Sequence, residues 1–189
     1  MERLASIDLG AHFFFQSLRR PWLDPLMKGL THVGDSYVVI AVGLLAVIAL
    51  LAAKRPWTAV AILLSGCLGI TISESVKKLV DRQRPPDVTN AVVPKPSSPS
   101  FPSGHALGST AVYGAIGLGA SQLMRSRGTR RLVIALGFLL PFLIGVTRLY
   151  LGVHFVFDVV GGWTAGVACV LLGHWVDRNF GDGGVVRVT

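Results

Sequence analysis

Two histidines and an aspartate have the types and spacing that covalent chemistry on a phosphate ester would need. His154 and Asp158 are four residues apart, so on a helix they would face one another. The carboxylate would then fix the tautomer of the imidazole and stabilise its charged form, which makes His154 the candidate nucleophile. His105, from a separate segment, is the candidate acid that protonates a leaving alcohol and afterwards the base that activates water.

Positive and hydrogen-bonding groups occur beside these three residues. Arg84 and Arg148 offer planar guanidinium groups suited to two phosphate oxygens at once, and Lys77 offers a mobile point charge. Ser103 and Gly104 directly precede an apolar run, where a hydroxyl, backbone N–H groups and the positive end of a helix dipole would meet an anion. Glycine also lets an oxygen approach the backbone closely. The set predicts a phosphate site.

Each of these residues also has an ordinary structural interpretation. A lone histidine near a helix end is usually an interfacial residue, and a His/Asp pair at this spacing is usually a surface ion pair. Lys77 could pair with Glu74 or extend to the membrane interface, and Arg84 could be an ordinary loop arginine. We assign only such structural roles to the three remaining histidines, His12, His32 and His174.

The composition indicates a membrane protein of one domain. The 189 residues are 51% hydrophobic with a mean hydropathy of +0.59, and only 15% are charged. A net charge of +8 could suggest nucleic acid, but no basic stripe with interleaved aromatics accompanies it, so we expect no nucleic-acid partner. Cys67 and Cys169 lie inside apolar runs and are expected to be small packing residues. No ligand set of metal-site spacing occurs, so we expect no metal and no cofactor.

Five apolar runs are long enough for a helical membrane bundle. A membrane-spanning helix needs about 20 apolar residues, and the candidates are residues 36–53, 57–80, 105–124, 132–150 and 154–176. Residues 1–35 mix aromatic and basic side chains, which suits an interfacial helix. A sixth span there is the alternative, although no apolar run in this segment reaches the needed length. We therefore predict an all-α fold in three parts, with an interfacial segment 1–35, a transmembrane domain 36–177 and a flexible polar tail 178–189.

The loops indicate how this bundle is oriented. Lys54 with Arg55, and the arginines of 125–131, have no evident chemical task and are placed in the cytoplasm by the positive-inside rule. With five spans, the proline-rich loop 81–104 and the turn 149–153 then share the outer side. The loop 87–101 is expected to contact a headgroup. The positive residues on that side break the rule unless they bind an anion.

Three motifs in this order resemble those of the type 2 phosphatidic acid phosphatase superfamily, which also includes vanadium haloperoxidases and bacterial acid phosphatases. Residues 77–85 (KKLVDRQRP) resemble its lysine, six-spacer, Arg-Pro element, and 102–105 (PSGH) its second motif. Residues 147–158 (TRLYLGVHFVFD) resemble the third, with Thr147 where the family usually has serine. The resemblance covers about residues 35–175. It implies a metal-independent mechanism through a phosphohistidine, in the roles assigned above, and an active site on the outer face of a bacterial plasma membrane.

The leading hypothesis is therefore a membrane phosphatase whose lipid substrate places its tail among the helices and its phosphate in the site. Candidate substrates are undecaprenyl diphosphate, phosphatidylglycerol phosphate and phosphatidate. Alternatives are a phosphotransferase that uses the same phosphohistidine, and a protein that binds or flips a lipid phosphate without cleaving it. Vanadate-dependent halide oxidation is a weaker option, because those enzymes are mostly soluble and larger. The oligomeric state is not predicted.

Overall fold

Seven helices make up the regular structure of residues 2–86 and 93–181, the parts of the chain that the computed structural model describes. No strand occurs in these residues. The all-α fold class is thus confirmed. The helices are α1 (Glu2–Ser17), α2 (Asp24–His32), α3 (Ser36–Ala52), α4 (Pro56–Val80), α5 (Gly104–Ser121), α6 (Arg127–Tyr150) and α7 (Val156–Phe180).

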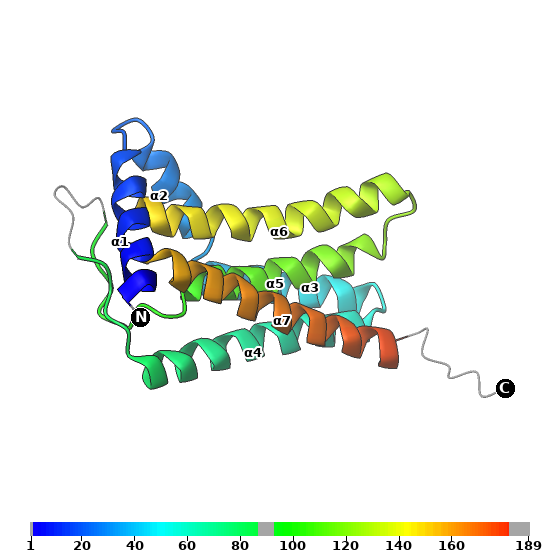
Figure 1. The fold of residues 1–189 in the computed structure, drawn as a ribbon. Coiled ribbons are helices and arrows are strands. Elements are labelled where there is room, and N and C mark those ends of the chain that lie inside the picture. The colour runs from blue at the N-terminus through cyan, green and yellow to red at the C-terminus, as the bar shows by residue number, and fades with distance from the viewer. Residues whose placement is uncertain (1, 87–92, 182–189) are drawn as a thin grey trace.

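The five helices α3 to α7 run along a common axis and form the bundle, while α1 lies across one end of it (Figure 1). Helix α5 occupies the middle and packs against α3, α4, α6 and α7. Most of its residues are buried. This explains why α5 is rich in small residues, since a central helix must approach four neighbours at once.

Three helices, α4, α6 and α7, are each long and apolar enough to cross a membrane, and α2 with α3 would form a fourth span bent by 49°. The five predicted runs correspond to α3 to α7, but α3 has 17 residues and α5 has 18, so the number of full spans stays approximate. Many apolar side chains on the outside of the bundle are exposed, as hydrocarbon contact requires. The protein is an integral membrane protein.

Glycines bring the central helix into backbone contact with its neighbours. A Cβ on Gly117 of α5 would lie 3.0 Å from the Cα of Gly137 in α6. On α7, a Cβ on Gly162 would lie 2.8 Å from the carbonyl oxygen of Ser103, and one on Gly166 would lie 2.9 Å from that of Leu107. Small residues on α5 and α7 therefore allow these helices to pack with their backbones in contact.

Helix boundaries follow local signals. Pro56 stands in the first turn of α4, where its missing N–H costs nothing. The same helix ends at Val80, and the next residue, Asp81, has a left-handed backbone with φ 41°, a conformation that Asp tolerates better than most residues. Ser126 caps α6 by accepting a hydrogen bond from the N–H of Thr129 at 3.1 Å. Helix α6 therefore begins at Arg127, five residues before the predicted start.

The two ends of the bundle differ in what they carry. The linkers α3–α4 and α5–α6, which hold the basic residues placed in the cytoplasm, lie at the end away from α1 (Figure 1). The α4–α5 loop and the α6–α7 turn lie together at the α1 end. The described residues 2–35 of the segment predicted to be interfacial hold α1 and α2 at that end, and their placement in the membrane stays a prediction. Residues 87–92 and 182–189, parts of the predicted headgroup loop and tail, lie outside the described residues.

Candidate active site

All eight predicted site residues lie at the α1 end of the bundle. They come from four places in the chain: the end of α4 and the loop after it, the start of α5, the end of α6, and the start of α7. Antiparallel helices bring these four places together although they are up to 81 residues apart in sequence. The residues are Lys77, Arg84, Ser103, Gly104, His105, Arg148, His154 and Asp158.

His154 and Asp158 meet, but not in the predicted way. His154 precedes α7, which begins at Val156, so the expected position in the first helical turn is wrong. Asp158 instead turns back and accepts the backbone N–H of Phe155 at 2.8 Å, as a residue in the first turn of a helix often does. That places its Oδ2 3.5 Å from Nδ1 of His154. The pair is buried, with His154 only 3% exposed.

Two residues without a predicted role hold the Asp158 carboxylate in place. Arg82 donates from Nη1 to Oδ1 of Asp158 at 2.6 Å. Ser100 donates its hydroxyl to Oδ2 and also lies 3.4 Å from Nδ1 of His154. Arg82 was inside the first motif, but nothing in its spacing separated it from the other spacer residues. Ser100 had no sequence signal, because the loop conformation alone brings it to Asp158.

Arg84 lies against the outer nitrogen of His154. Its Nη1 is 3.2 Å from Nε2 of the imidazole and also donates to the carbonyl of Val153 at 2.7 Å. Its Nε donates to the carbonyl of Ser98 at 2.8 Å, so the loop after α4 fixes the guanidinium. Burial lowers the pKa of His154 to about 4, and the charges of Arg84 and Arg148 act in the same direction while Asp158 opposes them. His154 is therefore a neutral imidazole at neutral pH, as a nucleophile must be.

Among the predicted site residues, two buried polar atoms have no hydrogen-bond partner in the described part of the chain. They are Nε of Arg148 and Oγ of Ser103. Arg148 is 7% exposed, its Nη1 donates to the hydroxyl of Thr31 at 2.8 Å, and it acts electrostatically on both His154 and His105. A buried guanidinium N–H and a buried hydroxyl that are left unpaired are costly. Anion oxygens would accept hydrogen bonds from both groups, which agrees with the predicted phosphate site.

Lys77 lies over the start of α5. Its Nζ would be 3.4 Å from a Cβ on Gly104, an ordinary contact distance, so the ammonium group lies beside the N-terminus of α5. Nζ also lies 3.5 Å from Oε1 of Glu74, which is the ordinary pairing considered above. That pair does not place Lys77 outside the site, because the same ammonium acts electrostatically on His105.

His105 is held by a carboxylate that carried no sequence signal. Its Nε2 lies 2.9 Å from Oδ1 of Asp35, and Oδ2 of the same carboxylate lies 2.8 Å from Nδ1 of His32. Asp35 sits at the α2–α3 junction, far from the three motifs in sequence. His32, to which we assigned only a structural role, is therefore connected to His105 through Asp35. The His32 side chain is mostly exposed.

A groove runs from this site along the bundle between α3, α4 and α5. Its volume is about 310 Å³, and its site end is lined by Ser73, Lys77 and Gly104. Further along, its walls are apolar, including Ile40, Leu44, Ile62, Leu63, Ile70 and Val112. Several of these side chains are exposed on the outside of the bundle. The groove therefore joins a charged end to the surface that faces hydrocarbon.

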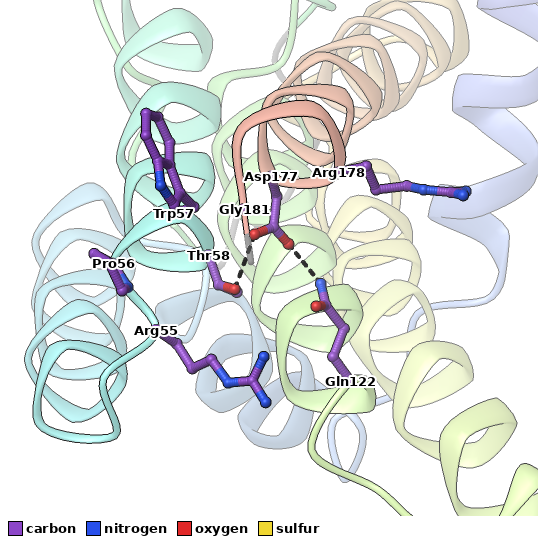
Figure 2. Close-up of a pocket in the computed structure, with 8 residues that line it drawn as sticks. All are labelled: Arg55, Pro56, Trp57, Thr58, Gln122, Asp177, Arg178 and Gly181. Carbon is purple, nitrogen blue, oxygen red and sulfur yellow. Dashed lines mark hydrogen bonds between the residues drawn. The ribbon is translucent and has the colours of Figure 1, made fainter. Parts of the chain in front are cut away.

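A second cavity, of about 400 Å³, lies at the opposite end of the bundle (Figure 2). Asp177 lies in it and accepts hydrogen bonds from Oγ1 of Thr58 at 3.0 Å and from Nε2 of Gln122 at 2.5 Å. These bonds tie α4, α7 and the end of α5 together. No histidine is among the residues that line this cavity. Within residues 2–86 and 93–181, no three His, Cys, Asp or Glu side chains are grouped to hold a metal ion.

The fold and site together define a class: a membrane-embedded enzyme in which a neutral histidine, a buried carboxylate and several cations surround a place for a phosphate. The chain belongs to the PAP2 superfamily, whose family model matches residues 57–182. The predicted resemblance is thus confirmed. The chain is a phosphatase of this superfamily, which acts on lipid phosphate esters through a phosphohistidine intermediate.

Several characterised proteins are similar over most of their length. Phosphatidylglycerophosphatase B of Bacillus subtilis is 30% identical over 156 residues, covering 82% of this chain and 75% of that protein. Undecaprenyl-diphosphatase of Sulfolobus acidocaldarius is 32% identical over 158 residues, covering 82% and 67%. The crystal structure of a transmembrane PAP2-type phosphatidylglycerolphosphate phosphatase from Bacillus subtilis matches with a TM-score of 0.87 at 27% identity, covering 96% of this chain and 90% of that one.

Proposed function

We propose that His154 attacks the phosphorus of a lipid phosphate and carries the phosphoryl group on Nε2. The observation that carries this proposal is the position of His154: it is buried, with Asp158 on the Nδ1 side and Arg84 on the Nε2 side. Attack makes the imidazole cationic, and Asp158 then stabilises it. Nε2 is the nitrogen that faces the guanidinium, and so the nitrogen beside which a phosphate oxygen would be held.

Cations and a hydroxyl bind the phosphate in this proposal. Arg84 and Arg148 bind its equatorial oxygens, since two guanidinium groups match the charge that the transition state spreads over them. Ser103, with its unpaired hydroxyl, and the N-terminus of α5 at Gly104 complete the site. Lys77 neutralises the remaining charge from the side of the groove.

His105 is the acid that protonates the leaving oxygen and the base that then activates water. Asp35 orients its ring by holding Nε2 at 2.9 Å. The first step breaks the bond between phosphorus and the leaving oxygen, and a proton from His105 completes the alcohol or lipid phosphate. In the second step His105 takes a proton from water, whose oxygen attacks the phosphorus and releases inorganic phosphate from His154.

The apolar groove between α3, α4 and α5 accepts the lipid tail, since it joins the phosphate site at Lys77 and Gly104. The substrate is a lipid phosphomonoester or diphosphate. Similarity to the Bacillus subtilis phosphatase in sequence and in fold makes phosphatidylglycerol phosphate the first substrate to test. Undecaprenyl diphosphate is the second, from the similarity to the Sulfolobus acidocaldarius enzyme, and phosphatidate the third.

We place the site on the extracytoplasmic side of a bacterial plasma membrane. The basic linkers at Lys54 and at 125–131 occupy the other end of the bundle, and positive residues in short linkers favour the cytoplasm. Labelling of single cysteines introduced at Ser126 and Ser98 with a membrane-impermeant reagent in intact cells tests this. Labelling of the linker position but not of the loop position would reverse the orientation.

The function is tested with purified protein in detergent with a chelator present. We expect phosphate release from at least one of the three lipids, and a base-stable, acid-labile phosphoenzyme that His154→Ala cannot form. His174→Ala, which changes a histidine near the other end of α7, is the matched control and should keep the phosphoenzyme. Absence of release from all three lipids, or a phosphoenzyme that survives in His154→Ala, contradicts the proposal.

A further inference from the structure

The N-terminal helix α1 contributes a buried carboxylate to the neighbourhood of the site. Asp8 on α1 is 1% exposed. Its Oδ2 accepts from Nη2 of Arg82 at 2.5 Å, and its Oδ1 accepts the backbone N–H of Phe157 at 3.1 Å. Asp8 therefore contacts both the loop after α4 and the start of α7. No sequence motif included it, since it lies 74 residues before its partner.

Arg82 connects Asp8 to the carboxylate beside the nucleophile. Its guanidinium donates from Nη2 to Asp8 and from Nη1 to Asp158, at 2.5 and 2.6 Å. It also lies 4.6 Å from the ring centre of Phe155, so it is packed in one position. Asp158 in turn reaches His154 with its other oxygen. An unbroken series of contacts thus runs from α1 to the nucleophile.

The balance of charge in this series bears on the chemistry. Arg82 and Asp158 by themselves form a neutral pair, which would stabilise a cationic imidazole poorly. With Asp8 included, two carboxylates surround one guanidinium, and the group carries one net negative charge towards His154. Because all of these groups are buried or partly buried, water screens that charge weakly.

We propose that Asp8 is a positioning residue for the phosphoryl transfer: it is the counter-ion of Arg82, so that Asp158 keeps its negative charge for His154. The N-terminal helix is then part of the catalytic unit as well as a cover over the end of the bundle. This inference rests on the proposed role of His154 as nucleophile. If Asp8 only held α1 against the bundle, its replacement would lower the thermal stability and leave the chemistry of His154 unchanged.

The test compares Asp8→Asn with wild type in detergent. We expect kcat for lipid phosphate hydrolysis and the rate of phosphoenzyme formation to fall by about 10- to 100-fold, while KM stays within about twofold, because the phosphate ligands are untouched. Asp8→Glu, which keeps the charge, should restore part of kcat. The double variant Asp8→Asn with Arg82→Gln should be faster than Asp8→Asn, since it removes the uncompensated cation.

The pH profile of kcat separates this role from a purely structural one, because a residue that only holds α1 against the bundle would not shift it. The groups facing His154 are Arg84 and Ser100 from the loop, Arg148 from α6 and Asp158 from α7. In Asp8→Asn the uncompensated Arg82 weakens the effect of Asp158, so the pKa of His154 falls and the acid limb of kcat moves to lower pH. Asp24→Asn on α2, which also removes a carboxylate of the N-terminal segment, should leave the acid limb in place.

The outcomes separate this inference from the proposed function. An Asp8→Asn variant with wild-type kcat and acid limb overturns the inference alone, provided that His154→Ala is inactive. A loss of kcat with an unmoved acid limb, matched by an equal loss of thermal stability and not restored by Asp8→Glu, also overturns it in favour of docking. An active His154→Ala overturns the proposed nucleophile and this inference with it.

Discussion

Replacing Asp158 by Asn tests the electrostatic role proposed for this carboxylate. Asn keeps the size of the side chain and can still accept the N–H of Phe155, but it removes the charge 3.5 Å from Nδ1 of His154. Two unit charges at that distance interact by about 5 kcal/mol at an effective dielectric constant of about 20. Since about 1.4 kcal/mol corresponds to a factor of ten, the loss predicts a kcat about 10³-fold lower.

The assay is release of phosphate from phosphatidylglycerol phosphate in detergent, with a burst measurement of the phosphoenzyme. The rate of phosphoenzyme formation should fall as much as kcat does, because the charge stabilises the state in which His154 is cationic. KM should change little, since Asp158 does not contact the phosphate in the proposed geometry. Thermal unfolding of the variant is the control for folding, because the substitution also removes the ion pair with Arg82.

A matched control lies on the same helix. Asp177 is also a buried carboxylate on α7 that accepts two side-chain hydrogen bonds (Figure 2). It is 19 residues further along, or about 28 Å at 1.5 Å per residue. Asp177→Asn should cost stability but leave kcat near wild type. If Asp158→Asn kept its fold and lost less than tenfold in kcat, the electrostatic reasoning would be refuted.

Three further predictions concern binding, pH and the acid. Arg148→Ala should raise KM at least about tenfold as well as lower kcat, because it removes a charged ligand of the phosphate; a changed kcat at constant KM in steady-state assays would contradict this. The pKa of His154 near 4 keeps it neutral down to that pH, so the acid limb of kcat/KM should lie near pH 4. Because the ordinary pKa of histidine is near 6.5, the unfolded chain binds more protons than the folded protein between about pH 6.5 and 4. The free energy of unfolding should therefore fall as the pH is lowered through that window, and it should fall less in His154→Gln, which lacks the titrating imidazole. Asp35→Asn should slow hydrolysis of a lipid phosphate more than that of p-nitrophenyl phosphate, since a good leaving group needs little help from His105; equal losses on both substrates would contradict its role.

Much of the fold was predictable because membrane helices follow composition. Spans of apolar residues bounded by charge, proline or glycine located α3 to α7 to within a few residues at most of their ends. Helix starts were less predictable: α6 begins at Arg127 because Ser126 caps it, although all of its first five residues are polar or glycine. An N-terminal interfacial helix was predicted, but its division into α1 and α2 was not.

The candidate site was predictable where residues are close in sequence or occur in a motif. His154 and Asp158 were paired from their four-residue spacing on a helix, but in the structure His154 precedes α7. The two side chains meet because Asp158, in the first turn of α7, accepts the N–H of Phe155, the residue just before the helix. Asp35 was missed because its contact with His105 spans 70 residues. A contact of that length depends on how helices pack, and local propensities carry no information about it.

The sequence by itself therefore determined the class of protein and its chemistry, and it supplied the candidate phosphate ligands, because residue type dictates charge, nucleophilicity and the solvent in which a helix is stable. Only the tertiary structure decided which groups hold those residues in place. Arg82, Ser100, Asp35 and Asp8 act through contacts between segments distant in the chain. The physical reason is that burial and charge balance at a site depend on the atoms packed around it, whichever part of the chain supplies them.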